Sequence, residues 1–120
     1  MVLSKGVQVE NFIGFTKILD LQVGIESYTG LSHWNDPDML EVGNGELTLD
    51  ENKAHFSLWC MLAAPLMLGN DIRKATPEIM EILLNKEVIA VNQDPLGKQG
   101  IKVRDDGDLE VWSKVLRDGS

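Results

Sequence analysis

Apolar residues recur at helical spacing in the first part of the chain. The steps of three and four residues predict an amphipathic helix over about residues 11–22, ending near Gly24. The positions that set this spacing are Phe12, Phe15, Ile18, Leu19 and Leu21. Residues 25–29 form a short run that is partly β-branched or aromatic, which predicts a weak strand or a loop.

A second helix is predicted over about residues 49–63. Thr48 and Glu51 have the spacing of a capping box, which marks a helix N-terminus. From Ala54 onward the helix is apolar nearly all round, so we expect it to be buried between layers. Pro65 ends it, and the continuous apolar run 65–68, bounded by Gly69, predicts a strand buried on both faces of a parallel sheet.

The remaining elements are a helix, a further helical segment and a hairpin. Thr76 as N-cap and Pro77 as the first helical residue predict a helix to about residue 84. A further turn or two is expected over 86–92, stopped by Asp94 and Pro95. Residues 101–104 and 109–112 alternate apolar and polar side chains around an Asp-Gly turn, which predicts a β-hairpin.

Residues 34–40 form the polar run least explained by packing, and Gly43, Asn44 and Gly45 follow it. Because a residue before proline favours extended backbone, we expect an extended strand end through Asp38, with Asp36 and Asp38 on the same side. Paired carboxylates can perform acid and base chemistry. A turn without chemistry is the commoner explanation for these residue types. Moreover, catalytic residues of a barrel normally come from the ends of different strands, which argues against this pair acting alone.

The order of elements predicts the α/β class with a parallel sheet. Repeated strand-loop-helix units with polar strand ends are typical of an α/β barrel or an open parallel sheet. Only two such units fit into 120 residues, whereas a complete barrel has eight and takes about 250 residues. The final hairpin has no predicted sheet to join. We therefore expect a segment of a larger architecture.

Composition excludes several classes of function. The net charge of -8 argues against nucleic-acid binding, and the longest apolar stretch is too short to span a membrane. Cys60 is the single cysteine, which excludes a disulfide framework and predicts a small buried hydrophobe. His33 and His55 lack helical partners at metal-ligand spacing, so we predict neither a metal nor a cofactor.

Four segments together resemble glycoside hydrolase family 27, the α-galactosidases and α-N-acetylgalactosaminidases. The resemblance extends from about Phe12 to Trp112, with the motifs in family order and at family-like spacing. Leu31 and Ser32 stand where the family usually has Pro-Gly. The segments that carry the resemblance are residues 34–40, 63–66, 70–73 and 85–97.

The resemblance implies that residues 1–97 are the last strand-helix units of a (β/α)₈ TIM barrel. Residues 98–120 would be the first hairpin of a C-terminal antiparallel β domain. Family members are retaining enzymes with one carboxylate as nucleophile and another as acid/base. These stand in Lys-x-Asp and Trp-Arg-x-x-x-Asp contexts, neither of which occurs in this chain. We therefore expect no catalytic residue here and no hydrolysis by the chain alone.

The resemblance also assigns substrate-facing residues. It implies that Asp38 and Met39 line the sugar pocket, while Trp34, Asn35 and Asp36 support the loop. The substrate would be an α-galactoside or an α-N-acetylgalactosaminide, which this sequence does not distinguish. Family members are mostly secreted, periplasmic or lysosomal, and residues 1–11 show no signal-peptide pattern, so the compartment stays open.

Two alternatives to a fragment of an enzyme follow from the same features. The chain could be a non-catalytic sugar-binding or partner-binding remnant of the fold. It could also be completed by a separate chain that carries the missing barrel strands.

Overall fold

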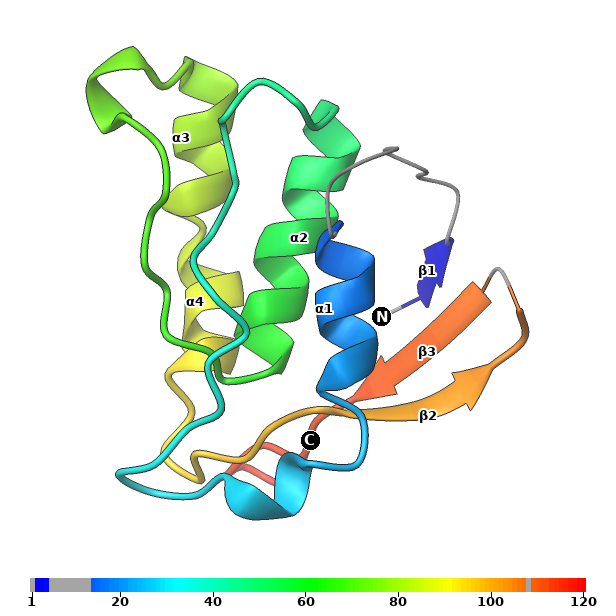
Figure 1. The fold of residues 1–120 in the computed structure, drawn as a ribbon. Coiled ribbons are helices and arrows are strands. Elements are labelled where there is room, and N and C mark those ends of the chain that lie inside the picture. The colour runs from blue at the N-terminus through cyan, green and yellow to red at the C-terminus, as the bar shows by residue number, and fades with distance from the viewer. Residues whose placement is uncertain (1, 5–13, 108) are drawn as a thin grey trace.

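Helix α2 (Leu49–Met61) lies at the centre of the molecule. In the computed structural model, which describes residues 2–4, 14–107 and 109–120, it packs between α1 (Phe15–Leu21) on one side and α3 (Pro77–Leu83) and α4 (Lys86–Asn92) on the other (Figure 1). The prediction of a helix buried nearly all round is confirmed. Its buried side chains are Asn52, His55, Phe56, Leu58, Trp59 and Cys60.

Both ends of α2 are fixed by local hydrogen bonds. At the N-terminus, the backbone N–H of Thr48 donates to Glu51 Oε2 at 2.6 Å, and the N–H of Glu51 donates to Thr48 Oγ1 at 3.3 Å, so the capping box is confirmed. At the C-terminus, the N–H of Ala64 donates to the Trp59 carbonyl at 3.1 Å across Ala63, which has a positive φ of 54°. This is the Schellman arrangement that commonly ends a helix, and Pro65 follows it.

The first predicted helix is confirmed over Phe15–Leu21, while its expected start at residues 11–13 lies outside the described residues. Of the weak strand or loop expected over 25–29, the strand is wrong. These residues contain a 3₁₀ helix, η1 (Glu26–Tyr28). It forms because the N–H of Tyr28 donates to the Ile25 carbonyl at 3.0 Å, while the Thr29 hydroxyl donates to the Glu26 carbonyl.

Helices α3 and α4 are both confirmed, and each begins at a capping side chain. Thr76 Oγ1 accepts the N–H of Ile79 at 3.4 Å, with Pro77 as the first helical residue. Asn85 Oδ1 accepts the N–H groups of Glu87 and Val88 at 3.1 and 3.2 Å. A 3₁₀ helix, η2 (Ile72–Lys74), precedes α3.

The sequence predicted a strand end near residue 38 and a parallel strand over 65–68. The structure has one parallel bridge between these segments, which joins Leu40 and Leu68. The N–H of Leu40 donates to the Met67 carbonyl at 2.8 Å, and the N–H of Gly69 donates to the Leu40 carbonyl at 2.9 Å. A Cβ on Gly69 would lie 2.7 Å from that carbonyl oxygen, so this approach requires glycine.

The expected burial of residues 65–68 on both faces is wrong. Met67 is 66% exposed and Leu68 is 45% exposed. Bridging is confined to the Leu40 side within the part of the chain that the structure describes, so no further strand covers these side chains there.

The predicted hairpin is confirmed as β2 (Ile101–Asp105) and β3 (Leu109–Ser113), with Gly107 at a positive φ of 73° in the turn. The expectation that this hairpin has no sheet to join is wrong. Strand β1 (Val2–Ser4) pairs antiparallel with β3, which gives a three-stranded sheet in the order β1-β3-β2.

Two lysines tie the sheet to the helices. Lys102 Nζ lies 2.8 Å from Asp20 Oδ1 in α1 and 2.9 Å from the buried Glu110 Oε1 in β3. Burial works against its charged form, but hydrogen bonds to Asp20, Glu110 and Asp105 outweigh burial and raise the Lys102 pKa. Lys114 Nζ donates to the carbonyls of Val91 at 2.7 Å and Cys60 at 3.3 Å, at the ends of α4 and α2.

The described residues thus form a helical layer beside a small antiparallel sheet. Cys60 is fully buried, as predicted, and burial raises the pKa of its thiol to about 12. None of the helices that the structure describes combines the length and the apolar character required to cross a bilayer.

Candidate functional site

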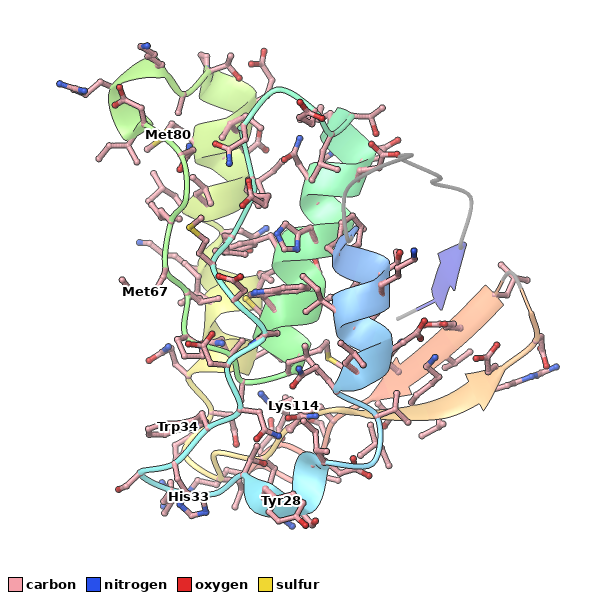
Figure 2. The ribbon with its side chains drawn as sticks, viewed as in Figure 1. Tyr28, His33, Trp34, Met67, Met80 and Lys114 are labelled. Atoms are coloured by element: carbon pink, nitrogen blue, oxygen red, sulfur yellow. The ribbon has the colours of Figure 1, made fainter. Side chains whose placement is uncertain are left out.

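The segment 34–43 runs along α2 and contains both buried and exposed side chains (Figures 1 and 2). Leu40 and Val42 are buried within the hydrophobic core, and Pro37 is also buried. Trp34 is 48% exposed and Met39 is 47% exposed, and both Asp36 and Asp38 are exposed. Figure 2 shows Trp34 and Met67 on the same edge of the molecule. The predicted site residues therefore form a surface that is backed by the core.

Asp38 does not adopt the extended backbone that was predicted, because its φ is +82°. Asp36 Oδ1 accepts the N–H of Asp38 at 3.0 Å, which forms a local turn, and Asp38 Oδ1 accepts the N–H of Met39 at 2.7 Å. Period-two alternation therefore fails at this point. The Asp36 carboxylate holds a turn, an arrangement different from the side-by-side pair expected from the sequence.

Asn35 connects this segment to two other parts of the chain. Its Nδ2 donates to the Ile25 carbonyl at 3.0 Å and to Gln99 Oε1 at 3.0 Å. Gln99 Nε2 in turn donates to the Gln22 carbonyl at 3.0 Å, which links the loop to the end of α1. Ser32, where the family resemblance leads us to expect glycine, has a positive φ of 72°.

Three α2 side chains contact the backbone of the same segment. Trp59 Nε1 donates to the Asp38 carbonyl at 2.8 Å. His55 Nε2 accepts the N–H of Glu41 at 3.0 Å, and Asn52 Oδ1 accepts the N–H of Gly43 at 2.9 Å. Sequence reasoning missed these contacts. The available signal was polar and aromatic residues at steps of three and four within an otherwise apolar helix.

His55 is a neutral core residue. It is fully buried, with its ring stacked on Phe15 at 4.9 Å between centroids and meeting the edge of Trp59 at 4.2 Å. Burial lowers the pKa of His55 to about 4. His33 lies on the surface, with Nδ1 3.1 Å from the Leu31 carbonyl. The described part of the chain contains no group of three His, Cys, Asp or Glu side chains placed to hold a metal ion.

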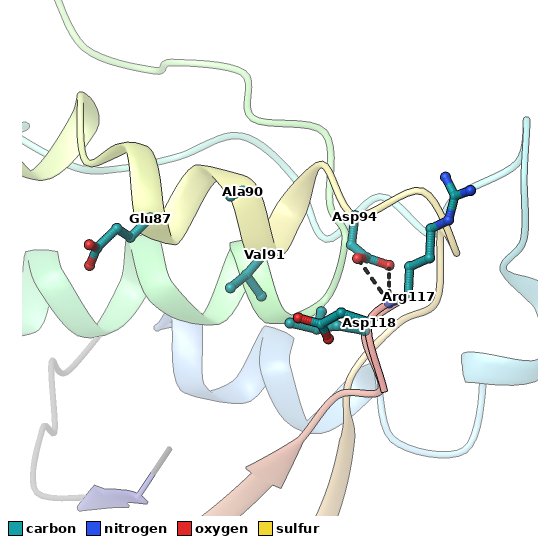
Figure 3. Close-up of a pocket in the computed structure, with 7 residues that line it drawn as sticks. Glu87, Ala90, Val91, Asp94, Arg117 and Asp118 are labelled. Atoms are coloured by element: carbon teal, nitrogen blue, oxygen red, sulfur yellow. Dashed lines mark hydrogen bonds between the residues drawn. The ribbon is translucent and has the colours of Figure 1, made fainter. Parts of the chain in front are cut away.

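A hollow of about 660 Å³ lies away from this segment, between α4 and the C-terminal residues (Figure 3). Asp94 lines the hollow, and its carboxylate accepts the backbone N–H of Arg117 at 3.2 and 3.1 Å. None of the predicted site residues lines this hollow. The residues that line it are Glu87, Ala90, Val91, Asp94, Leu116, Arg117 and Asp118.

Residues 5–94 match the family model described as alpha galactosidase A, a span that includes the whole candidate site. The chain belongs to this family. The resemblance seen in the sequence is thereby confirmed. Alpha-galactosidase A of Cellvibrio japonicus is 52% identical over 106 residues, which are 88% of this chain and 26% of that protein.

Parts of solved alpha-galactosidase structures have the same fold as the chain. Alpha-galactosidase I from Mortierella vinacea superposes with a TM-score of 0.84 at 38% identity, over 87% of this chain and 26% of that one. The alpha-galactosidase from Saccharomyces cerevisiae, solved with raffinose, gives a TM-score of 0.81 at 35% identity, over 88% and 25%. The chain thus spans about a quarter of the length of these members of the alpha galactosidase A family.

Proposed function

We propose that this chain is part of a retaining α-galactosidase that acts on terminal α-galactosyl residues. In this proposal it supplies the last strand-helix units of a TIM barrel, over residues 1–97, and the start of a β domain, over 98–120. The observation that carries the proposal is the pairing of a fixed backbone with outward-facing side chains at Asp38 and Met39. Membership of the alpha galactosidase A family supplies the reaction class.

Asp38 suits the binding of a sugar hydroxyl. Its carbonyl is held by Trp59 at 2.8 Å, and its φ of +82° is an unusual conformation for a residue other than glycine. Such conformations persist where the surrounding structure enforces them, often at ligand-binding positions. The carboxylate lies exposed and is a strong acceptor for hydroxyl groups.

Met39 would supply the apolar part of the same wall. Sugar pockets combine a few fixed polar groups with apolar side chains that exclude water. Met39 is 47% exposed immediately beside Asp38, so one short stretch of backbone presents both kinds of contact. Trp34, Asn35 and Asp36 would hold the loop in place, and the choice between galactose and N-acetylgalactosamine stays open.

Bond cleavage would depend on carboxylates outside this sequence. A retaining mechanism needs two carboxylates about 5 to 5.5 Å apart on opposite sides of the scissile bond. Asp36 accepts the N–H of Asp38 within a turn, which ties it to the loop. The exposed Met67 and Leu68 would be covered by further barrel strands, in the same polypeptide or in a complementing chain.

A chimera tests this proposal. The aligned residues of this chain replace their counterparts in alpha-galactosidase A of Cellvibrio japonicus, and hydrolysis of p-nitrophenyl α-galactoside is measured. We expect an active chimera. Within it, Asp38→Asn should raise KM by about 10- to 100-fold, because a hydrogen bond to a charged group is lost while the turn geometry is kept.

Asp36→Asn is the matched control in the chimera. An asparagine Oδ1 can still accept the N–H of Asp38, so KM should stay within about threefold of the parent chimera. A folded chimera without activity, or equal effects of the two substitutions, would contradict the proposed role of Asp38.

A further inference from the structure

Asn52, His55 and Trp59 lie on one face of α2, at steps of three and four residues. They contact the backbone of the site segment in reverse order, at Gly43, Glu41 and Asp38. The helix and the segment therefore run antiparallel, and side chains of α2 take the place of a neighbouring strand along this stretch. We call these three residues the α2 ladder.

The segment needs the α2 ladder because it has few backbone partners within the described part of the chain. Leu40 makes a backbone bridge to residues 67 and 69. The N–H of Glu41 instead meets His55, at 3.0 Å from Nε2. A buried N–H without an acceptor is strongly unfavourable, so the acceptor at residue 55 determines whether the backbone can hold this position.

We propose that His55 is a positioning residue of the sugar site, which fixes the backbone at Glu41 and thereby holds Asp38 and Met39 in their outward orientation. The link to a sugar rests on the proposed function. The positioning itself depends only on contacts within this chain.

The protonation pattern of His55 supports a role beyond packing. Because Nε2 accepts a hydrogen bond, the proton of the neutral ring is on Nδ1, and this buried atom has no hydrogen-bond partner among the residues that the structure describes. An apolar residue of similar shape would avoid that unpaired donor. The residue here is instead a histidine, and its acceptor nitrogen binds the N–H of Glu41.

Two substitutions at His55 separate the effect of its hydrogen-bond acceptor from the effect of its ring packing. His55→Phe keeps an aromatic ring against Phe15 and Trp59 but removes the acceptor. His55→Gln places an amide group where Nε2 lies and can accept the same N–H. Amide hydrogen exchange of the full 120-residue chain, followed by NMR, measures the result at each backbone position.

In His55→Phe we expect the Glu41 amide to exchange at least about tenfold faster, and the Met39 amide signal to shift. The Gly43 amide, held by Asn52, should keep its protection and serves as an internal reference. In His55→Gln, exchange at Glu41 should return to within about threefold of the parent chain.

Ile82→Val is the matched control, because it trims a buried side chain of α3 without touching the α2 ladder. Unchanged exchange at Glu41 in His55→Phe would overturn the proposal. A uniform acceleration of all amides, as expected for Ile82→Val, would also overturn it, because His55 would then contribute packing alone.

A measurement on the parent chain removes any dependence on the folding of a variant. A scalar coupling between the Glu41 amide nitrogen and His55 Nε2 across the N–H···N hydrogen bond is expected, and its absence would overturn the proposal. An inactive chimera would refute the sugar-binding role while leaving these results unchanged. The two failures are therefore distinguishable.

Discussion

Ser32, Asp38 and Ala63 adopt positive φ angles of 72°, 82° and 54° although none is glycine. Each marks a place where the chain changes direction: before the site segment, within it, and after α2. A side chain in this region costs about 1 to 2 kcal/mol relative to ordinary backbone angles. Local strain is therefore concentrated around the elements that build the candidate site.

Ser32→Gly should stabilise the chain. Ser32 is exposed, so the substitution relieves backbone strain without removing packing, and we expect a gain of about 0.5 to 1 kcal/mol in the free energy of unfolding. Urea denaturation measures the change. Ser57→Gly in the interior of α2 is the control and should lose about 0.5 kcal/mol. A loss of stability at both positions would contradict strain at Ser32.

His55 should make stability depend on pH between 6.5 and about 4. Burial lowers its folded pKa from 6.5 to about 4, so only the unfolded chain binds a proton within this window. The free energy of unfolding is therefore highest above pH 6.5. It falls by about 3 kcal/mol in total as the pH drops toward 4.

Urea denaturation at pH 7 and pH 4.5 tests this effect in the parent chain and in His55→Gln. The glutamine variant should lose about 2 to 3 kcal/mol less than the parent between the two pH values. His33→Gln removes an exposed histidine and should behave like the parent. Equal pH dependence in all three chains would show that His55 is not held neutral by burial.

At the scale of elements, local signals in the sequence predicted the helices and the hairpin well. The Thr48 capping box, the Thr76-Pro77 start and the Asp-Gly turn each act through neighbours a few residues away, and all three are present. Elements that depend on distant partners were predicted poorly. The run 65–68 has the composition of a buried strand, but its burial depends on neighbouring strands that the described residues do not provide.

The candidate site also combines features set by neighbouring residues with features set by distant ones. Residue types alone singled out residues 34–40, and the role of this run as a sugar site stays a prediction. Its geometry could not be predicted in this way, because the φ of Asp38 and the support from His55 and Trp59 depend on how α2 packs against the segment. The pairing of β1 with β3 likewise joins residues more than a hundred positions apart, which a local pattern cannot reveal.

Thr48→Ala tests the local contribution of the α2 capping box. It removes the acceptor for the N–H of Glu51 and should lower the free energy of unfolding by about 1 kcal/mol. Thermal or urea unfolding followed by circular dichroism measures the loss. Thr16→Ala, within α1, lies away from the cap and should change stability by less than about 0.5 kcal/mol. Equal effects at both positions would mean that the capping box adds nothing.

At the scale of the whole molecule, a packed helical layer supports an exposed edge. Trp59 and Leu58 are at most 1% exposed, whereas Met39, Met67 and Leu68 are each at least 45% exposed. The chain spans about a quarter of the alpha-galactosidases that it matches. In our account this edge carries the sugar-facing wall of a larger barrel, and the groups that break the glycosidic bond belong to other strands.

The central claim is that this chain supplies a sugar-facing wall but not the catalytic carboxylates. Its most direct test is the rate of p-nitrophenyl α-galactoside hydrolysis by the purified 120-residue chain. The account predicts no release of p-nitrophenol above the buffer blank, because the Lys-x-Asp and Trp-Arg-x-x-x-Asp contexts do not occur in this sequence. Steady turnover that is abolished by Asp36→Asn or Asp38→Asn would contradict it, because those carboxylates would then be catalytic.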